Sequence, residues 1–432
     1  MAEKYFPLDK KKLDELTSRF PTPFYLYDEK GIRENARRLK KAFGILPGFT
    51  EFFAVKGLPN PFILKILADE GFGTDCSSLP ELILSERSGI SGERIMFTSN
   101  QTPAAEYEYA YKQGAIINLD DITHIDYLHG ALKTFPELIS FRYNPGPLRE
   151  GNAIIGKPEE AKYGLTKAQL FDAYKKAADL GAKRFGLHTM IASNELSNEY
   201  FVETGRMLYD LCVELKQALG IDMEFINIGG GMGIPYKKEQ KAVDYGIIAQ
   251  GIKSAYESRI KENPLFAGKE IRLYMECARV ITGPYGYLIT KAIHEKHIYR
   301  DYIGTDACMA DLMRPGMYGA YHEVQVSGKE KAKADRVYDI VGSLCENCDK
   351  FAVQRAMPEI KVGDTLIIFD AGAHGRAMGF NYNGKLRCAE LLLRPDGSVV
   401  QIRRKETIDD YFATLDFNAL DSFSASIDPE RR

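Results

Sequence analysis

The sequence predicts a (β/α)8 barrel joined to a separate β-domain. Eight short apolar runs alternate with segments of helical periodicity over about 230 residues, a length that suits a barrel of this type, which typically needs ~250 residues. After about Ile281 the pattern changes to alternating strands without long helices. A doubly wound open sheet remains the alternative from this pattern alone.

The barrel strands are predicted from their apolar runs. In chain order these are residues 49–55, 71–76, 95–98, 115–119, 138–143, 184–188, 223–228 and 271–275. Helical spacing separates most of them, because apolar residues three or four apart share one helix face. Residues 201–219 give the clearest example, with Leu208, Leu211, Leu215 and Leu219 on one side. Strand–helix alternation of this kind indicates parallel strands with crossover helices.

The β-domain is predicted from strands at 285–297, 337–342, 365–369, 386–393 and 398–403, with Pro395-Asp396-Gly397 as a hairpin turn. Residues 22–27 form another strand, which we expect to join this sheet as part of a β-barrel or sandwich. We therefore assign residues 30–283 to the barrel and residues 1–29 and 284–421 to the β-domain. Residues 422–432 are predicted to be a disordered polar tail.

Composition excludes several functional classes. The net charge of -3 gives no reason to expect nucleic-acid binding. No apolar run approaches the ~18 residues of a membrane span, and the polar N-terminus does not read as a secretory signal. An odd set of seven cysteines suits free thiols in the cytoplasm. Cys345 and Cys348 form a C-x-x-C without a second pair, so we expect no metal.

Functional residues gather at the predicted strand ends. In barrels of this type the active site lies at the carboxyl ends of the strands. Six of those ends carry polar side chains or glycines: Lys56, Asp75, Arg142, His188, Gly229-Gly230-Gly231, and Glu276 with Arg279. Each alone could be a helix cap, a core residue or a turn. Together they predict one functional rim.

Lys56 ends the first strand, directly after Phe53-Ala54-Val55. An amine at the end of a buried strand can be desolvated, which lowers its pKa and leaves a neutral nucleophile. Three glycines follow the seventh strand, where backbone amides and the positive end of the next helix can hold a phosphate. A reactive lysine, a phosphate site and the Glu276 carboxylate together predict pyridoxal 5'-phosphate (PLP). Lys56 would hold its aldehyde carbon, and Glu276 would keep its pyridine nitrogen protonated.

Motifs along nearly the whole chain then show a family resemblance. They are Phe53-Ala54-Val55-Lys56, 71–78 (G-x-G-x-D-x-x-S), Arg142-Tyr143-Asn144-Pro145, Lys162-Tyr163-Gly164, 228–236 (I-G-G-G-M-G-I-P-Y), Arg314-Pro315-Gly316-Met317-Tyr318, Cys345-Glu346-Asn347-Cys348-Asp349 and Asn381-Tyr382-Asn383. In their order and spacing the chain resembles the fold type III PLP-dependent decarboxylases, and within them the diaminopimelate decarboxylases. The resemblance implies a PLP-binding barrel, a C-terminal β-domain and a homodimer with shared active sites.

The resemblance also implies residue roles. Cofactor binding would involve Lys56, Asp75, His188, Ser193, Gly229, Gly230, Gly231, Glu276, Ala278, Arg279 and Tyr382. The substrate, a small amino acid, would meet Arg279, Arg314, Tyr318, Glu346 and Tyr382. Cys345 would reach the partner's site with Glu346 and protonate the carbon that loses its carboxylate. The implied reaction converts meso-2,6-diaminopimelate to L-lysine and CO2, a step of lysine biosynthesis.

Two motifs depart from the family pattern. Its E-P-G-R reads Glu276-Cys277-Ala278-Arg279, and Ala278 lacks the φ freedom of glycine. Its H-x-H-I-G-S reads 188–193 with Met190 where a histidine stacks on the cofactor, although a thioether can also lie against a ring. A decarboxylase of D-lysine, D-ornithine or a carboxylated polyamine therefore remains an alternative. An amino-acid racemase is disfavoured by Glu276, and a non-catalytic PLP carrier by Cys345 and the arginines.

Overall fold

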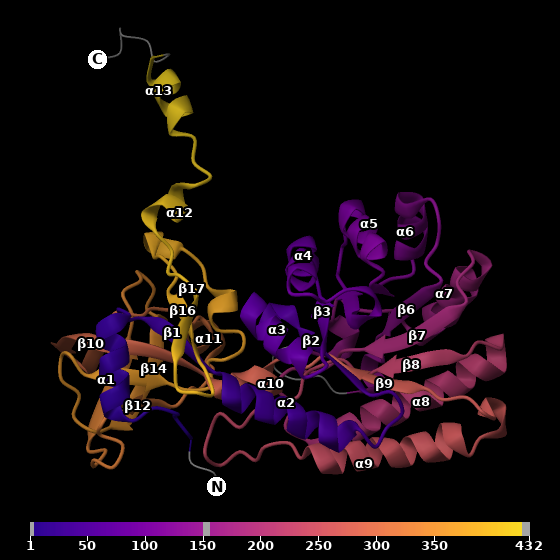
Figure 1. Ribbon diagram of the computed structural model, residues 1–432, viewed down its shortest axis with the longest axis horizontal. Coiled ribbons are helices and arrows are strands. Elements are labelled where there is room, and N and C mark those ends of the chain that lie inside the picture. Colours follow the sequence, from indigo (N-terminus) through magenta and orange to yellow (C-terminus); the bar gives the residue numbers. More distant parts are fainter. Residues whose placement is uncertain (1–3, 150–155, 426–432) are drawn as a thin grey trace.

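The computed structural model describes residues 4–149 and 156–425. It contains two bodies that lie side by side (Figure 1). One is a closed barrel of parallel strands surrounded by helices, and the other is a mixed sheet. The predicted fold class, a (β/α)8 barrel with an additional β-domain, is therefore confirmed, and the open-sheet alternative is excluded.

The barrel consists of strands that each pair in parallel with the next, and β9 closes it against β2. Its strands are β2 (Thr50–Ala54), β3 (Gly73–Cys76), β4 (Ile95–Thr98), β5 (Ile116–Leu119), β6 (Leu138–Tyr143), β7 (Arg184–Thr189), β8 (Met223–Asn227) and β9 (Arg272–Met275). Every predicted barrel strand is confirmed within a few residues. The closed ring brings all the strand ends predicted to carry function to one rim.

The barrel helices alternate with the strands and cover the outside. They are α2 (Glu29–Phe43), α3 (Pro61–Asp69), α4 (Leu79–Arg87), α5 (Ala104–Gln113), α6 (His124–Leu132), α7 (Lys167–Asp179), α8 (Asn198–Leu219), α9 (Tyr245–Tyr256) and the short α10 (Arg279–Thr282). The predicted apolar face of α8 is buried at Leu208, Leu211 and Leu215. This amphipathic pattern explains why the helix packs against the barrel.

An apolar plug fills the barrel interior below the rim. It consists of Phe52, Met96, Ile116, Leu138, Phe225 and Tyr274. The rings of Phe225 and Tyr274 stack with their centroids 4.4 Å apart. Gly186 makes room for this pair, because a Cβ there would lie 2.0 Å from Phe225. The plug makes the barrel a solid support with chemistry only at its rim.

The β-domain is a nine-stranded mixed sheet. Its strands are β1 (Phe24–Asp28), β10 (Gly286–His297), β11 (Asp301–Thr305), β12 (Val324–Val326), β13 (Arg336–Val341), β14 (Lys350–Met357), β15 (Thr365–Ile368), β16 (Ala389–Leu393) and β17 (Val399–Arg403). The N-terminal strand β1 joins this sheet, as predicted, and lies between β10 and β16. The sequence did not predict β11, β12 and β14. Two helices, α1 (Lys10–Arg19) and α11 (Arg314–Tyr318), belong to this part.

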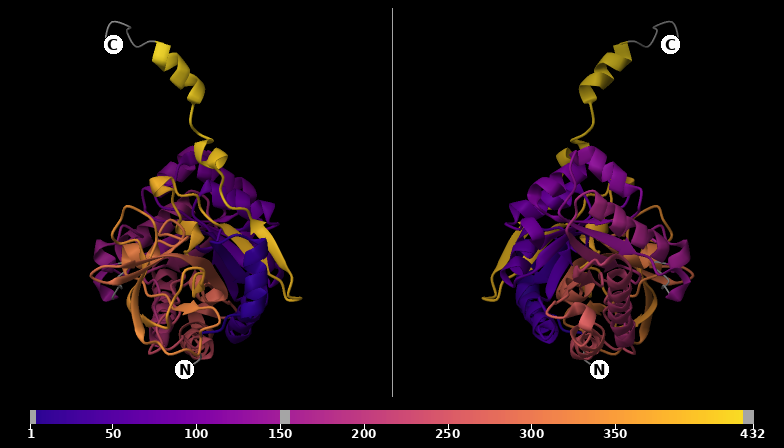
Figure 2. Two further views of the ribbon diagram at one scale, coloured as in Figure 1. Left: turned by 90° about the vertical axis from the view of Figure 1, so that its left-hand side faces the viewer. Right: turned by 90° about the vertical axis from the view of Figure 1, so that its right-hand side faces the viewer.

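The C-terminal segment extends away from both bodies. It contains α12 (Ile408–Phe412) and α13 (Phe417–Ala425), and the side views show α13 standing clear of the rest (Figure 2). Residues 422–425, predicted as tail, continue this helix, whereas 426–432 lie outside the described residues. No helix in the described part of the chain is long and apolar enough to cross a membrane. The domain boundaries remain predictions.

Candidate active site

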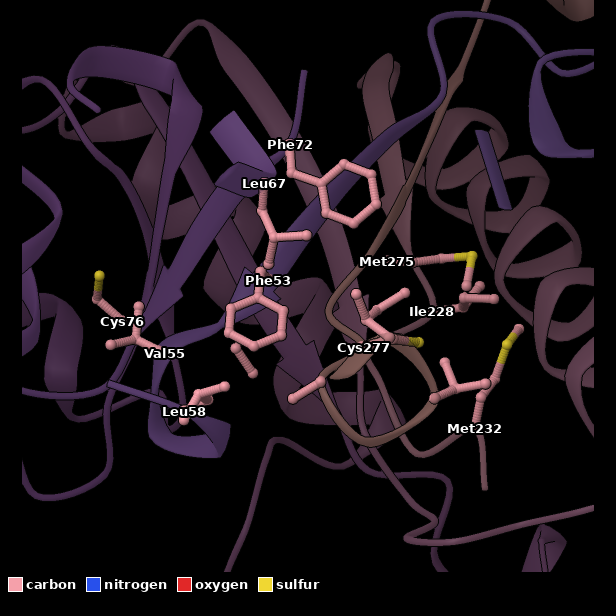
Figure 3. Close-up of a cluster of buried hydrophobic side chains, with 14 of the residues drawn as sticks. Phe53, Val55, Leu58, Leu67, Phe72, Cys76, Ile228, Met232, Met275 and Cys277 are labelled. Carbon is pink, nitrogen blue, oxygen red and sulfur yellow. The ribbon is translucent and has the colours of Figure 1, made fainter. Parts of the chain in front are cut away.

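Lys56 lies in a single tight turn, residues Val55–Gly57, directly after β2. Val55 and Leu58 on either side of it are buried in the apolar layer around the barrel (Figure 3). These anchors hold the turn while the lysine side chain points to the barrel mouth, where it is 51% exposed. Its Nζ lies 2.8 Å from Asp75 Oδ2. The amine is therefore held at the rim but open to an incoming molecule.

The strand register explains the ion pair between Lys56 and Asp75. Ala54 pairs with Asp75 across β2 and β3, which brings the carboxylate beside the lysine turn. Asp75 is itself 1% exposed. Burial and the charge of Glu276 raise the pKa of Asp75 to about 7, although Lys56 opposes this shift. The carboxyl can thus exchange a proton near neutral pH.

The expectation of a lowered pKa for Lys56 is wrong for the chain without a bound cofactor. Surrounding atoms do favour the neutral amine by desolvation, but attraction to Asp75, and to a lesser extent Glu276, outweighs this effect. The net result raises the pKa of Lys56 above its ordinary value. The lysine is therefore a charged group at the rim, and it must lose a proton before it acts as a nucleophile.

A buried hydrogen-bond network surrounds Glu276 at the end of β9. Its Oε2 lies 3.0 Å from His188 Nε2, and its Oε1 accepts a bond of 2.7 Å from Asn227 Nδ2. Burial favours the neutral acid, but His188, Lys56 and Asn227 outweigh it and lower the pKa of Glu276. The network thus keeps an anionic carboxylate at the centre of the barrel mouth. The sequence prediction missed Asn227, although it too stands at a strand end.

The glycine loop follows β8 and lies against neighbouring backbone. Gly229 and Gly231 have φ of +69° and +93°, a conformation that favours glycine. A Cβ on Gly230 would lie 2.3 Å from the carbonyl oxygen of Glu276, so only glycine fits. One expectation is wrong: the next helix, α9, begins only at Tyr245 and does not directly follow this loop. Any anion at this loop would therefore bind without that helix, and the Gly229 and Gly230 amides already donate to Asn227 Oδ1 and Met190 Sδ.

Met190 contacts the glycine loop directly. Its Sδ accepts a hydrogen bond of 3.2 Å from the Gly230 N–H. The following segment, which carries Ser193, also lies along this loop, because Glu195 N donates to Gly231 O over 2.9 Å. The structure thus places Met190 and Ser193 on the same side of the barrel mouth as the glycines. The thioether stands where the family pattern has a histidine.

Ala278 does not disturb the backbone. Its φ of -118° and ψ of -57° are accessible to an alanine, so the expected loss of glycine freedom has no effect here. The Ala278 methyl packs on the lysine turn, since a Cβ on Gly57 would lie 2.4 Å from it. The residue therefore supports the turn that carries Lys56.

Arg279 and Arg314 form a second cationic feature. Both donate to the hydroxyl of Tyr236, over 2.7 and 2.8 Å, and both are less than 10% exposed. Neither makes an ion pair with a carboxylate within residues 4–149 and 156–425. Burial and the neighbouring Arg279 lower the pKa of Arg314. Two buried guanidiniums around one hydroxyl suit a bound anion.

His322 completes the surroundings of the arginine pair. Its Nδ1 lies 2.8 Å from the Phe369 carbonyl oxygen and its Nε2 lies 3.4 Å from Arg314 Nη1. Burial lowers the pKa of His322 to about 3, so the ring stays neutral and adds no further charge. Neither His322 nor Tyr236, the last residue of the 228–236 motif, was predicted as a site residue. Their role depends on contacts between barrel and β-domain that the sequence pattern does not reveal.

The remaining predicted residues lie on loops of the β-domain. Cys345 N donates to Asn383 Oδ1 over 2.8 Å, and a hydrogen bond to Glu346 raises the pKa of Tyr382. Cys345 and Tyr382 are exposed, as is Tyr318 at the end of α11. Cys345, Glu346 and Tyr382 form a cluster, and within the described part of the chain no hydrogen bond or ion pair joins it to Lys56. The role of Cys345 and Glu346 in a partner's site, and that of Tyr382 in cofactor and substrate contact, remain predictions.

The rim fits a phosphate-bearing aldehyde cofactor. Two buried atoms at the mouth, Asp75 Oδ1 and His188 Nδ1, have no hydrogen-bond partner in the described part of the chain. Lys56 would supply an amine, the glycine loop would lie against a phosphate, and Glu276 would supply an anion for a protonated ring nitrogen. The model of the pyridoxal-binding domain of pyridoxal-dependent decarboxylases matches residues 29–283.

The chain belongs to the pyridoxal-dependent decarboxylase family. Its cofactor is therefore PLP, and the chain is a PLP-dependent decarboxylase. It is 42% identical to the protein TabA of Pseudomonas amygdali pv. tabaci over 423 residues, which cover 98% of this chain and 97% of that one. It is also 36% identical to diaminopimelate decarboxylase of Methanothermobacter thermautotrophicus over 401 residues, 92% of each chain.

Solved structures agree with this relationship. Diaminopimelate decarboxylase of M. jannaschii in complex with L-lysine superposes with a TM-score of 0.85 at 30% identity, over 93% of this chain and 94% of that chain. The enzyme of Helicobacter pylori, also with L-lysine, gives 0.82 at 27% identity, over 95% and 100%. The structural likeness covers both the barrel and the β-domain.

Proposed function

We propose that this decarboxylase acts on meso-2,6-diaminopimelate and releases L-lysine and CO2 as a step of lysine biosynthesis. The observation that carries the proposal is the arginine pair. Arg279 and Arg314 are buried without a carboxylate partner in the described residues, so they suit the distal carboxylate of a dicarboxylic substrate. The relatives named diaminopimelate decarboxylase support this choice.

The residues would divide the work as follows. When bound, PLP supplies an electron sink for the pair left behind as CO2 departs. Lys56 would carry the cofactor, and Glu276 would hold the proton on its ring nitrogen. The phosphate would be held by a set of loop residues: Ser193, Gly229, Gly230, Gly231, Ala278 and Arg279. Asp75, His188 and Tyr382 complete the proposed cofactor contacts.

Substrate recognition and proton delivery would use both domains. Arg279, Arg314 and Tyr318 would bind the distal carboxylate. In a homodimer, the partner subunit's Glu346 would hold the distal ammonium, and the partner subunit's Cys345 would protonate the carbon that has lost CO2. The exposed cluster of Cys345, Glu346 and Tyr382 supports this arrangement, because such groups are available to a second chain. We propose a homodimer on this basis, and a cytoplasmic location because the cysteines are free thiols in the described residues.

A second candidate is a decarboxylase of D-lysine or D-ornithine, or of a carboxylated polyamine. The observation that favours this candidate is Met190, which stands at the glycine loop in place of a family histidine. The relationship to TabA is a second reason for this candidate, because the chain is 42% identical to TabA and 36% identical to the decarboxylase of M. thermautotrophicus.

Release of CO2 from four separate substrates tests the proposal. The PLP-loaded protein is incubated with meso-diaminopimelate, D-lysine, D-ornithine or L-lysine. We expect turnover of meso-diaminopimelate, abolished in Lys56→Ala. Turnover of D-lysine without meso-diaminopimelate would overturn the substrate while keeping the chemistry. Arg314→Gln provides the matched control: it should impair the dicarboxylic substrate and spare any turnover of D-lysine, which has no distal carboxylate.

A further inference from the structure

His374 lies where the β-domain crosses onto the barrel. Residues 369–375 leave β15 and run over the rim. The His374 N–H donates to Gly57 O over 2.8 Å, and the Gly372 N–H donates to Gly283 O over 3.1 Å. Gly57 belongs to the turn of Lys56, and Gly283 follows the helix that begins with Arg279. The crossing segment is therefore attached to both loops that carry rim cations.

The crossing segment carries two polar side chains, Asp370, which pairs with Lys4, and His374. A Cβ on Gly372 would lie 2.0 Å from the Thr282 carbonyl oxygen, and one on Gly375 would lie 2.7 Å from the Tyr25 hydroxyl. Side chains therefore do not fit at these two positions. His374 adopts φ of +54°, which is unfavourable for a residue other than glycine and persists where surrounding contacts impose it. Such strain is typical of functional sites.

The imidazole lies beside the lysine turn. A Cβ built on Gly57 would lie 3.9 Å from His374 Cε1, which is ordinary contact distance. The charged groups that act on the ring come from three elements: Lys56 from the turn after β2, Arg279 from α10 and Arg314 from α11. All are cations. The ring therefore lies within electrostatic reach of the arginine pair, and the same Gly57 position meets both His374 and Ala278, the neighbour of Arg279.

We propose that His374 is a further substrate-binding residue, whose imidazole hydrogen-bonds the distal carboxylate held by Arg279 and Arg314. This inference rests on the proposed dicarboxylic substrate. Burial, and then Arg279, Arg314 and Lys56, hold the pKa of His374 well below its usual range, so the free protein presents a neutral ring. A neutral imidazole still offers one N–H donor.

Carboxylate binding changes the electrostatics of this histidine. The bound anion offsets the two guanidinium charges that disfavour imidazolium, so the pKa of His374 rises on binding. A protonated ring then donates a charge-assisted hydrogen bond to the same carboxylate. Because binding and protonation are linked, the substrate's affinity gains a dependence on pH that the arginines alone would not give.

Nuclear magnetic resonance of the PLP-loaded protein tests the contact without relying on turnover. The chain has seven histidines, so labelling of histidine ring carbons gives few signals. His374→Asn identifies the signal of His374, and asparagine tolerates the left-handed backbone. We compare L-lysine, which retains the distal carboxylate, with 1,5-diaminopentane, which lacks it. L-lysine should move this signal and raise its titration midpoint, whereas 1,5-diaminopentane should leave both unchanged.

Binding measurements give the second readout. His374→Asn should weaken L-lysine binding about tenfold, the loss expected for one hydrogen bond to a charged group, and should spare 1,5-diaminopentane. His297→Asn is the matched control, because His297 is exposed and paired with Asp301 at the end of β10. Equal L-lysine affinity in His374→Asn and the unaltered protein, or a His374 signal indifferent to L-lysine, overturns the inference.

The two proposals fail in different ways. If meso-diaminopimelate is not decarboxylated but L-lysine moves the His374 signal through its carboxylate, the substrate assignment fails and the histidine contact stands. If meso-diaminopimelate is decarboxylated and His374→Asn binds L-lysine normally, the substrate stands and the histidine contact fails.

Discussion

Replacing Glu276 with glutamine tests the buried network at the centre of the rim. The substitution keeps the size of the side chain but removes its charge. In the structure both carboxylate oxygens are engaged, by Asn227 Nδ2 at 2.7 Å and by His188 Nε2 at 3.0 Å. The amide NH2 group must face one of these partners. Facing Asn227 it would oppose a donor, so we expect it to turn towards His188.

The cost to folding follows from these contacts. A buried hydrogen bond that is lost or mispaired costs about 1–3 kcal/mol. The pKa of Glu276 is lowered from its ordinary value of 4.5 in the folded protein, so its ionised form stabilises the fold above about that pH. This contribution is lost as pH falls through the folded pKa. The stability difference between the unaltered protein and Glu276→Gln should therefore narrow in acid.

The cost to catalysis should be larger. If Glu276 holds the proton on the cofactor ring, its loss removes a preorganised charge, and such a loss typically costs about 10²–10³-fold in kcat. Cofactor loading should persist, because Lys56 and the glycine loop are unchanged. Loss of the Glu276 charge also lowers the pKa of Lys56, which this carboxylate helps to raise. The assay is CO2 release at several pH values with PLP content measured in parallel.

Glu81→Gln supplies the matched control. Glu81, in the first turn of α4, also raises the pKa of Lys56. Its carboxylate differs from that of Glu276 because it accepts a hydrogen bond from Ser77 N. The same isosteric change at Glu81 should leave kcat within a few-fold of the value for the unaltered protein. A Glu276→Gln protein that keeps its full kcat, or that loses activity only because PLP no longer binds, would refute the assigned role.

Three further predictions concern the rim and its support. Lys56→Ala should abolish visible absorbance of the lysine-bound cofactor in a PLP titration; persistence of that absorbance would refute the assignment. Met190→Ala should weaken PLP binding up to about tenfold, as expected for a lost sulfur–aromatic contact, whereas Met190→Leu serves as a volume control. Burial raises the pKa of Asp370 to about 6 despite its ion pair with Lys4, so ionisation costs the fold about 3 kcal/mol between pH 4 and 6. As pH rises from 4 to 6, the Tm of Asp370→Asn should fall less than the Tm of the unaltered protein. An equal fall would contradict the raised pKa of Asp370.

The barrel could be predicted because its strands are buried on both faces. Such strands read as continuous apolar runs, and β4, for example, is buried at every residue from Ile95 to Thr98. The missed strand β14 shows the opposite case. Its sequence mixes charged and apolar residues, and its burial alternates irregularly at the end of the sheet order. A half-exposed edge strand gives no such signal.

The site could be predicted only as far as strand ends reveal it. Lys56, Asp75 and Glu276 were found because parallel strands direct their carboxyl ends to one rim. The direction of the Lys56 pKa was missed because it depends on the register of Ala54 against Asp75, which no local pattern encodes. His374 was missed because its segment reaches the rim from the β-domain.

The departure from the E-P-G-R motif is accommodated by the surroundings of Cys277. A proline has no N–H, whereas the Cys277 N–H is buried and needs an acceptor. Glu51 on β2 provides it. Burial raises the pKa of Glu51 well above its ordinary value, which favours the neutral form of the carboxyl that supports the loop. The two chemically active ends of the motif, Glu276 and Arg279, therefore keep their places, and the substitution changes how the loop is supported rather than what it presents to the barrel mouth.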